Sequence, residues 1–422
     1  MKKPEATYLL DRFRFHWPDD DVDIIVDRLH EEKAGLQCEL TITTGSMPAP
    51  GLLREGRFNL SAPVTRGQWE KALTERMPDI DWYAVLEQIC TLSIRRWREG
   101  EPLIDLASVE PSSELPYLLS PYVIDGGASV IFADGGSGKS LFALALALSI
   151  ATGEECVPGA VPLRCGPVLY LDWEWDPESH AERLTALCAA LGTTVPAGMI
   201  FYRREVSSVI ESASAIRQHV AAIGAVAVVV DSLGMARGGE PESADLTIRT
   251  FGAFRTFGVP VIAIDHVAKH ATDKSQSFGS VYTKNAARIM WRLDSVRDEA
   301  TGQLGLNLVN TKANRKTQAS RGYRVTMEED TAERLTSVRF ESADIRSIPG
   351  MAKSLGVKDQ IASVLMRGAL TDEEIVAALA NEGITVTEAN VRLAAFRHKD
   401  TFVTVIGEDR VRRRGLLSRS VS

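Results

Sequence analysis

The sequence contains one stretch that decides its fold, Ser129-Val130-Ile131-Phe132-Ala133-Asp134-Gly135-Gly136-Ser137-Gly138-Lys139-Ser140. An apolar run breaks into glycines, ends in Gly-Lys-Ser and is followed by residues 141–152, which are rich in Ala and Leu. A strand, a glycine-rich turn and a helix in this order are the context that a phosphate-binding P-loop requires. The glycines let backbone N–H groups turn inward around phosphates, and the helix N-terminus adds the positive end of its dipole.

This loop predicts where a nucleotide and Mg²⁺ bind. We expect Lys139 to place its charge between the β- and γ-phosphates and Ser140 to place its hydroxyl on Mg²⁺. The usual G-x-x-x-x-G-K-S pattern begins here with Ala133 in place of glycine, which leaves the loop buildable. The alternative, a glycine-rich turn with a surface lysine, does not explain the flanking strand and helix. The predicted nucleotide-binding residues are Ala133, Asp134, Gly135, Gly136, Ser137, Gly138, Lys139, Ser140 and Leu141.

Length and composition indicate a globular protein of several domains. The chain has 422 residues, which is more than one hydrophobic core usually serves. The net charge of -8 excludes a protein coated in basic residues, so any nucleic-acid contact must come from local concentrations of Lys and Arg. The 5 cysteines contain no C-x-x-C pair, which favours reduced, structural thiols. No apolar stretch reaches the length of a membrane span and the N-terminus lacks a signal peptide, so we expect a cytoplasmic protein without a membrane partner.

Apolar strands that end in polar side chains follow the P-loop. They end at Asp172 and Glu174, at Asp231 and at His266. Since the carboxyl ends of parallel strands face the ligand crevice, we expect Glu174 to be the general base for an attacking water. Asp231 is the Walker B carboxylate that holds Mg²⁺, and His266 would report whether the γ-phosphate is present. The alternatives are that the acids at the end of the first of these strands only cap it, and that the histidine is structural.

Two loops and one basic segment extend this site. The loops 234–245 and 267–285 are long and polar, and loops of this kind are usually functional. Residues 311–316 place Lys312 and Arg315 on a turn, from which a cation can reach the nucleotide of a neighbouring subunit. The alternative is a solvated basic turn.

The two ends of the chain differ from the centre in charge and in pattern. Residues 1–110 have strand-like runs at 22–29 and 36–44, two helical segments and a net charge of -6, which favours docking to a protein or oligomerisation. Near the C-terminus, three short helices and a hairpin predict a winged helix-turn-helix. The second helix begins at Thr371, and the third begins at Thr387 with Ala389, Leu393 and Phe396 on one face.

The basic residues of the chain are concentrated at this C-terminal end. Residues 392–422 hold 8 Lys and Arg against 3 acids, a balance that suits contacts to DNA phosphates. Winged helices also bind proteins, so a protein partner is the alternative.

The central region resembles the RecA-like ATPases of the RepA and DnaB type, the hexameric replicative helicases of plasmids and phages, and their AAA-labelled bacterial relatives. The resemblance spans roughly residues 128–325, and its matching segments are 135–140, 168–174, 228–232 and 265–269. It implies that the polar loops face a central channel and grip single-stranded DNA. The sequence departs from RepA-type proteins at Gly279-Ser280, where their neighbouring arginine is missing.

The resemblance also implies a set of catalytic residues. It assigns the catalytic base to Glu174, the sensor to His266, and the fingers that act on a neighbouring subunit to Lys312 and Arg315. With Lys139 of the P-loop these five residues form the expected catalytic set, and Ser140 and Asp231 form the expected metal site.

The expected fold class is α/β. A RecA-like P-loop NTPase core at 111–345 is preceded by a small α+β N-terminal domain at 1–110 and followed by a C-terminal winged-helix domain at 346–422. The expected protein is an oligomeric ATPase, a hexamer that uses ATP and Mg²⁺ and acts on DNA as a RepA-type helicase or translocase. Single-stranded DNA would occupy the channel, and duplex DNA the winged helix. The alternatives are a recombination or repair ATPase that assembles on DNA without unwinding it, and a DNA-binding regulator switched by ATP.

Overall fold

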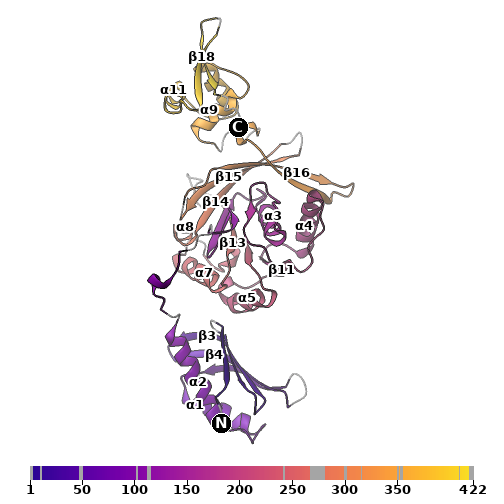
Figure 1. Ribbon diagram of the computed structural model, residues 1–422, viewed down its shortest axis with the longest axis vertical. Helices are drawn as coiled ribbons and strands as arrows, with labels where there is room; N and C mark the ends of the chain where they lie inside the picture. Colours follow the sequence, from indigo (N-terminus) through magenta and orange to yellow (C-terminus); the bar gives the residue numbers. More distant parts are fainter. Residues whose placement is uncertain are drawn as a thin grey trace. The chain divides into compact units, whose positions relative to one another are not determined.

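The computed structural model divides the chain into two compact units, Met1–Leu115 and Pro116–Ser422 (Figure 1). It describes residues 3–9, 12–46, 51–100, 103–111, 116–240, 243–266, 281–298, 302–314, 316–348, 351, 355–407 and 409–417. Within these ranges no helix is long and apolar enough to cross a membrane.

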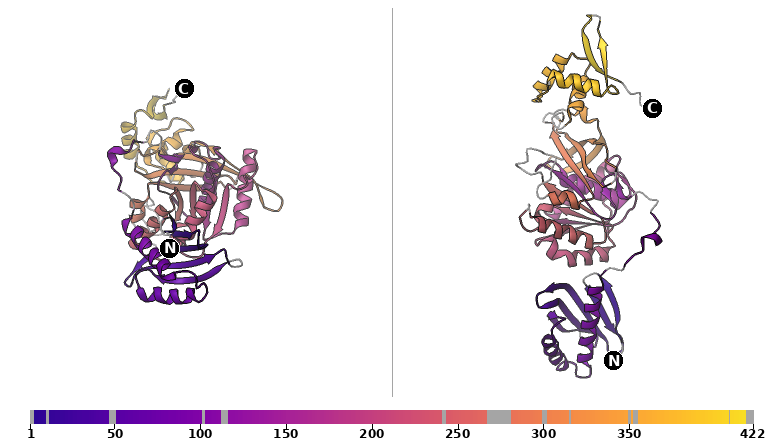
Figure 2. Two further views of the ribbon diagram at one scale, coloured as in Figure 1. Left: turned by 60° about the horizontal axis from the view of Figure 1, so that its bottom comes forward. Right: turned by 90° about the vertical axis from the view of Figure 1, so that its left-hand side faces the viewer.

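The first unit is an antiparallel sheet of five strands in chain order, with two helices packed against one of its faces (Figure 2). Its strands are β1 (Glu5–Leu9), β2 (Arg12–Trp17), β3 (Val22–Glu32), β4 (Gly35–Thr44) and β5 (Leu52–Asn59), and its helices are α1 (Pro63–Thr74) and α2 (Trp82–Glu99). Along β4 every second side chain is buried, because alternate residues of a strand point to opposite faces. The two strands and two helices expected here are confirmed, and β1, β2 and β5 are additions.

The second unit is built on a sheet of nine strands in the order β11-β10-β12-β13-β8-β14-β15-β16-β17. The strands from β11 to β14 run parallel to their neighbours, and the last three are antiparallel. The parallel strands are β8 (Ala128–Ala133), β10 (Val168–Asp172), β11 (Ile200–Arg204), β12 (Ala227–Asp231), β13 (Val261–His266) and β14 (Ile289–Arg297). The antiparallel ones are β15 (Leu304–Ala313), β16 (Arg321–Glu329) and β17 (Leu335–Ser342).

Helices cover both faces of this sheet and create two hydrophobic cores. One core contains α3 (Lys139–Thr152) and α4 (Pro177–Leu191); the other contains α5 (Val209–Ile223) and α7 (Ala244–Thr256) (Figure 1). Because both faces are covered, the central strands are continuous apolar runs, as in β12, where all five residues are buried. A small separate sheet contains β6 (Tyr117–Ser120), β7 (Val123–Ile124) and β9 (Val161–Pro162).

The C-terminal part of the second unit has its own hydrophobic core. It contains α9 (Val357–Leu365), α10 (Asp372–Asn381) and α11 (Glu388–Arg397), followed by the hairpin of β18 (Phe402–Ile406) and β19 (Arg412–Leu416). Capping boxes at Thr371 and Thr387 confirm the expected starts of the second and third helices. On α11 the buried residues are Val391 and Ala394, so Leu393 and Phe396 lie on the outside of the helix.

The segments expected to be loops contain more regular structure than the sequence suggested. The loop expected at 234–245 is shortened by α6 (Leu233–Ala236) and by the start of α7, and the loop expected at 267–285 ends in α8 (Val281–Ala286). Residues 267–280, including Gly279-Ser280, lie outside the described residues, as does Arg315. The turn expected around Lys312 is wrong, because β15 continues through that residue and pairs it with β14.

Candidate functional site

The P-loop joins the centre of the sheet to a helix N-terminus. Strand β8 lies between β13 and β14, and α3 begins at Lys139, directly after the loop. Gly138 is the N-cap residue with φ 88°, and Gly136 has φ 71°, both in the left-handed region that favours glycine. A Cβ on Gly138 would lie 3.1 Å from a methyl carbon of Leu304. Glycine at these positions therefore allows the loop to curl with its N–H groups at the helix end, as phosphate binding requires.

The Lys139 ammonium lies within this loop and is almost completely buried. Its Nζ donates to the backbone oxygens of Ala133 at 3.1 Å and of Asp134 at 2.7 Å. Burial lowers the pKa of Lys139, while the nearby carboxylates of Asp231 and Glu174 act in the opposite direction. The cation is thus already placed among the groups that would surround a bound phosphate chain.

The two predicted metal ligands lie in contact. The Asp231 carboxylate is 3 % exposed at the end of β12, and it accepts a hydrogen bond from the Tyr170 hydroxyl at 2.8 Å. Burial raises the pKa of Asp231, whereas hydrogen bonds from Ser140 and Tyr170 lower it. A hydroxyl and a carboxylate beside a helix N-terminus fit Mg²⁺, which takes one or two protein oxygens and fills its other positions with water and phosphate oxygens.

Glu174 lies beside this pair, at the end of the neighbouring strand. Strands β10 and β12 are paired so that Asp172 is opposite Asp231, which brings the residues after both strands to the same edge. The Oε1 atom of Glu174 accepts from the Ser232 hydroxyl at 2.5 Å and lies 3.8 Å from Nε2 of His266. The pKa of Glu174 is below its usual value. The His266 ring has the largest effect and the Ser232 hydroxyl acts in the same direction, whereas burial opposes them. An ionised, partly exposed carboxylate can accept a proton from water.

The site is a cavity of about 490 Å³ that contains residues which sequence reasoning missed. Besides the P-loop, Glu174, Asp231 and His266, the lining residues are Trp175, Arg183, Arg297, Leu304, Met327, Glu329 and Leu335. The Arg183 guanidinium lies 4.8 Å from the centre of the Trp175 ring. Most of these residues belong to α4 and to the antiparallel strands, where no motif marks them. The aromatic residues that flank Glu174 in the sequence were the one available signal.

Lys312 is not among the residues that line this cavity. Its Nζ donates to the backbone oxygens of Lys284, Asn285 and Ala287 at the C-terminal end of α8. Burial lowers the pKa of Lys312, and the nearby Arg288 acts in the same direction. In the described chain this cation therefore caps a helix, and its role as a finger stays a prediction, as does that of Arg315.

Two comparisons with known proteins match parts of this chain. Residues 100–272, less than half of the chain, match a family described as an AAA domain. Among solved structures, a KaiC-like protein from the archaeon Pyrococcus horikoshii OT3 is similar at 15 % identity with a TM-score of 0.39, over 53 % of this chain and 93 % of that chain. The sheet order and the P-loop define a RecA-like P-loop ATPase core, and the residues that match the family include its strands from β8 to β13.

Proposed function

We propose that this protein is a Mg²⁺-dependent ATP hydrolase that forms oligomers and acts on DNA in the manner of RepA-type helicases. The observation that carries the hydrolase part is the Glu174 carboxylate, which lies beside the P-loop and is ionised at neutral pH. A P-loop alone would serve nucleotide binding. A carboxylate within reach of the phosphates adds the group that removes a proton from the attacking water.

We assign the cavity of about 490 Å³, which the P-loop lines, to a nucleoside triphosphate. The phosphate chain would follow the N–H groups of the loop, with Lys139 neutralising its charge. The base would lie against the apolar and aromatic side chains that also line the cavity, namely Trp175, Met327 and Leu335. An aromatic ring with a stacked guanidinium offers a base both a flat surface and hydrogen-bond donors.

The chemistry divides among residues of three strand ends and the P-loop. Ser140 and Asp231 would hold Mg²⁺, which supplies positive charge to the phosphate oxygens. Glu174 orients the water and takes its proton, while Lys139 stabilises the charge that develops in the transition state. His266, whose Nε2 lies 3.8 Å from Oε1 of Glu174, would respond to the γ-phosphate. Because phosphoryl transfer depends mainly on positioning and electrostatics, these residues supply the part of the catalytic machinery that one subunit can provide.

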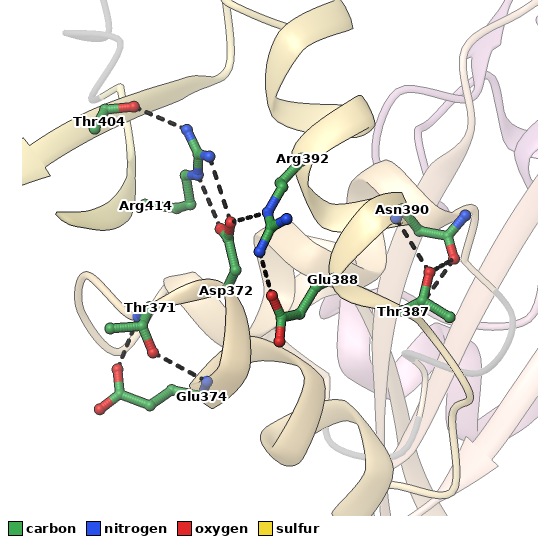
Figure 3. A network of polar contacts seen from close by, with 9 residues as sticks. All are labelled: Thr371, Asp372, Glu374, Thr387, Glu388, Asn390, Arg392, Thr404 and Arg414. Carbon is green, nitrogen blue, oxygen red and sulfur yellow. Dashed lines mark hydrogen bonds and ion pairs between the residues drawn. The ribbon is translucent and has the colours of Figure 1, made fainter.

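The proposal of DNA binding rests on the C-terminal part. Figure 3 shows that two of its cations are engaged inside the domain: Arg414 and Arg392 both donate to Asp372, and Arg392 also contacts Glu388. Arg413 likewise pairs with Asp409. The exposed cations that would meet DNA phosphates are Arg397, Lys399, Arg410 and Arg412. Three helices and a hairpin with exposed cations support binding by α11 and the hairpin.

The test is the steady-state ATPase rate with and without single-stranded DNA, with Glu174→Gln as the control. We expect hydrolysis that DNA stimulates and that the variant loses by about 10²-fold or more, since removing general-base catalysis costs 10²–10⁴ in rate. Absence of hydrolysis in the wild type would contradict the proposal as a whole. An ATPase rate that DNA does not change would contradict the proposed motor activity on DNA but not the proposed ATP hydrolysis.

The separate core of residues 357–417 favours one second candidate, a DNA-binding regulator switched by ATP. That function predicts binding to duplex DNA that survives Lys139→Ala and disappears when residues after 355 are removed. The helicase function predicts instead that Lys139→Ala abolishes strand displacement.

A further inference from the structure

A buried carboxylate holds the backbone of the segment that carries Glu174. Asp172 is completely buried at the end of β10. Its Oδ1 accepts from the backbone N–H of Glu174 at 2.7 Å and from that of Trp175 at 3.2 Å. Its Oδ2 lies 2.5 Å from Nε2 of His180, which is almost completely buried on α4. One side chain thus links the strand, the catalytic segment and a helix.

The histidine is itself fixed between two tyrosines that both contact the site. Its ring centre is 4.7 Å from that of Tyr170 and 5.6 Å from that of Tyr202. The Tyr170 hydroxyl donates to Asp231, and the Tyr202 hydroxyl donates to the backbone oxygen of Trp175 at 2.9 Å. The backbone of residues 174–175 is therefore held at both N–H groups and at one carbonyl.

Stability alone does not account for a charged group in this position. Burial of a carboxylate costs free energy unless it is paired and hydrogen-bonded, and a well-packed apolar pair is often as stable or more so. The partners of Asp172 come from two separate elements, namely the backbone N–H groups of residues 174–175 and the His180 ring on α4. The two oxygens of the carboxylate are bound to different elements, so its direction is fixed as well as its position.

We propose that Asp172 and His180 form a buried pair that positions Glu174 for catalysis. They are positioning residues, since they act through the backbone of residues 174–175 and do not reach the cavity. The inference rests on the proposed function of Glu174 as the base. A misplacement of a catalytic group by about 1 Å can cost about 10²-fold in rate, so loss of this restraint should lower kcat and leave nucleotide binding intact.

The test compares two replacements of the histidine in the full-length protein. His180→Leu removes the donor to Asp172, whereas His180→Gln keeps an N–H donor in a similar place. We expect His180→Leu to lower kcat by about 10- to 100-fold with KM for ATP changed by less than about threefold, and His180→Gln to recover most of the loss. His219→Leu on the exposed side of α5 is the matched control and should behave as wild type. Binding of a fluorescent ATP analogue gives the fraction of folded sites.

A second pair of variants separates positioning from a general structural role. If His180 acts only through the base, His180→Leu should cause no further loss of kcat in a protein that already carries Glu174→Gln. A wild-type kcat in His180→Leu, or a further tenfold loss in the double variant, would overturn the inference. If His180→Leu does not fold, Tyr202→Phe removes a single hydroxyl and is subject to the same two measurements. An unchanged rate in Glu174→Gln would instead reject the proposed base.

Discussion

A completely buried ion pair includes Asp265, the residue before His266 on β13, and the replacement of its arginine has a calculable consequence. The guanidinium of Arg237 lies 3.5 Å from the carboxylate of Asp265 and donates to the Thr283 hydroxyl at 2.8 Å. All three side chains are completely buried. Burial raises the pKa of Asp265 from 3.8 to about 6, although Arg237 and, more weakly, His266 and Lys139 oppose that shift. Replacing Arg237 by Met removes the main opposing charge.

The pH dependence follows from the direction of this shift. The pKa of Asp265 is higher in the folded state, so its contribution to stability is present below pH 3.8 and is lost as the pH rises through about 6. Without the guanidinium the folded carboxyl would keep its proton to still higher pH. At about pH 5.5 it is largely protonated in both folded proteins; at about pH 8 it is ionised only in the wild type. From 1.36 kcal/mol per pKa unit, the variant should lose up to about 2.5 kcal/mol more than wild type over this range.

Thermal unfolding measures this difference. For a unit of this size, 1 kcal/mol corresponds to about 2–4 °C, so the gap in Tm between Arg237→Met and wild type should widen by roughly 5–10 °C from about pH 5.5 to about pH 8. Loss of the hydrogen bond to Thr283 adds a penalty that does not depend on pH. A second variant, Arg237→Met with Asp265→Asn, cannot ionise at this position. Only the wild type then loses the contribution of Asp265, so the gap between the two should narrow by about 1 kcal/mol or less over this pH range and should not widen. An equal gap at both pH values in Arg237→Met would refute the reasoning.

Two further predictions concern the loop and the C-terminal domain. Gly138→Ala forces a side chain into a left-handed backbone and towards Leu304, so it should cost about 1–2 kcal/mol and weaken nucleotide binding, as measured by Tm and by titration with a fluorescent nucleotide. The double change of Arg397 and Arg412 to Ala should weaken DNA binding and reduce the slope of log K against log salt by about 2, with the DNA-free ATPase rate unchanged. Arg367→Ala, an exposed arginine of the same domain, is its control; a slope equal to that of the wild type in the double variant would count against phosphate contact.

The centre of the fold could be predicted because its signals are local. Continuous apolar strands such as Val228–Val230 need both faces covered, which requires a parallel sheet with helices on each side. Their polar ends then meet at one edge, which is how Glu174, Asp231 and His266 come together. The strands of the first unit were harder to predict. Strand β5 contains Arg54, Glu55 and Arg57 around a glycine and shows little alternation, so composition alone does not mark it as a strand.

The cavity residues on β16 and β17 could not be predicted from the sequence, for a different reason. Met327 and Leu335 lie on two antiparallel strands more than 150 residues after Glu174, and they reach the cavity because β17 packs along α4. One contact that fixes this packing joins the backbone N–H of Leu335 to the Glu182 carboxylate at 2.7 Å. Such a contact depends on the register of the sheet. In the sequence Glu182 looks like an exposed acid on a helix, and nothing there indicates its contact with Leu335.

Lys312 shows how a charge pattern can suit two different roles. A helix leaves its last carbonyl oxygens without partners, and a cation at that end satisfies them and interacts favourably with the dipole. A finger that reaches a neighbouring phosphate needs the same long side chain and the same charge. In the single chain the Lys312 ammonium fills the first role, because it donates to three carbonyl oxygens at the end of α8; the finger role stays a prediction. In an isolated subunit the residue is a helix cap, so any action on a neighbouring nucleotide has to begin with release of that helix end.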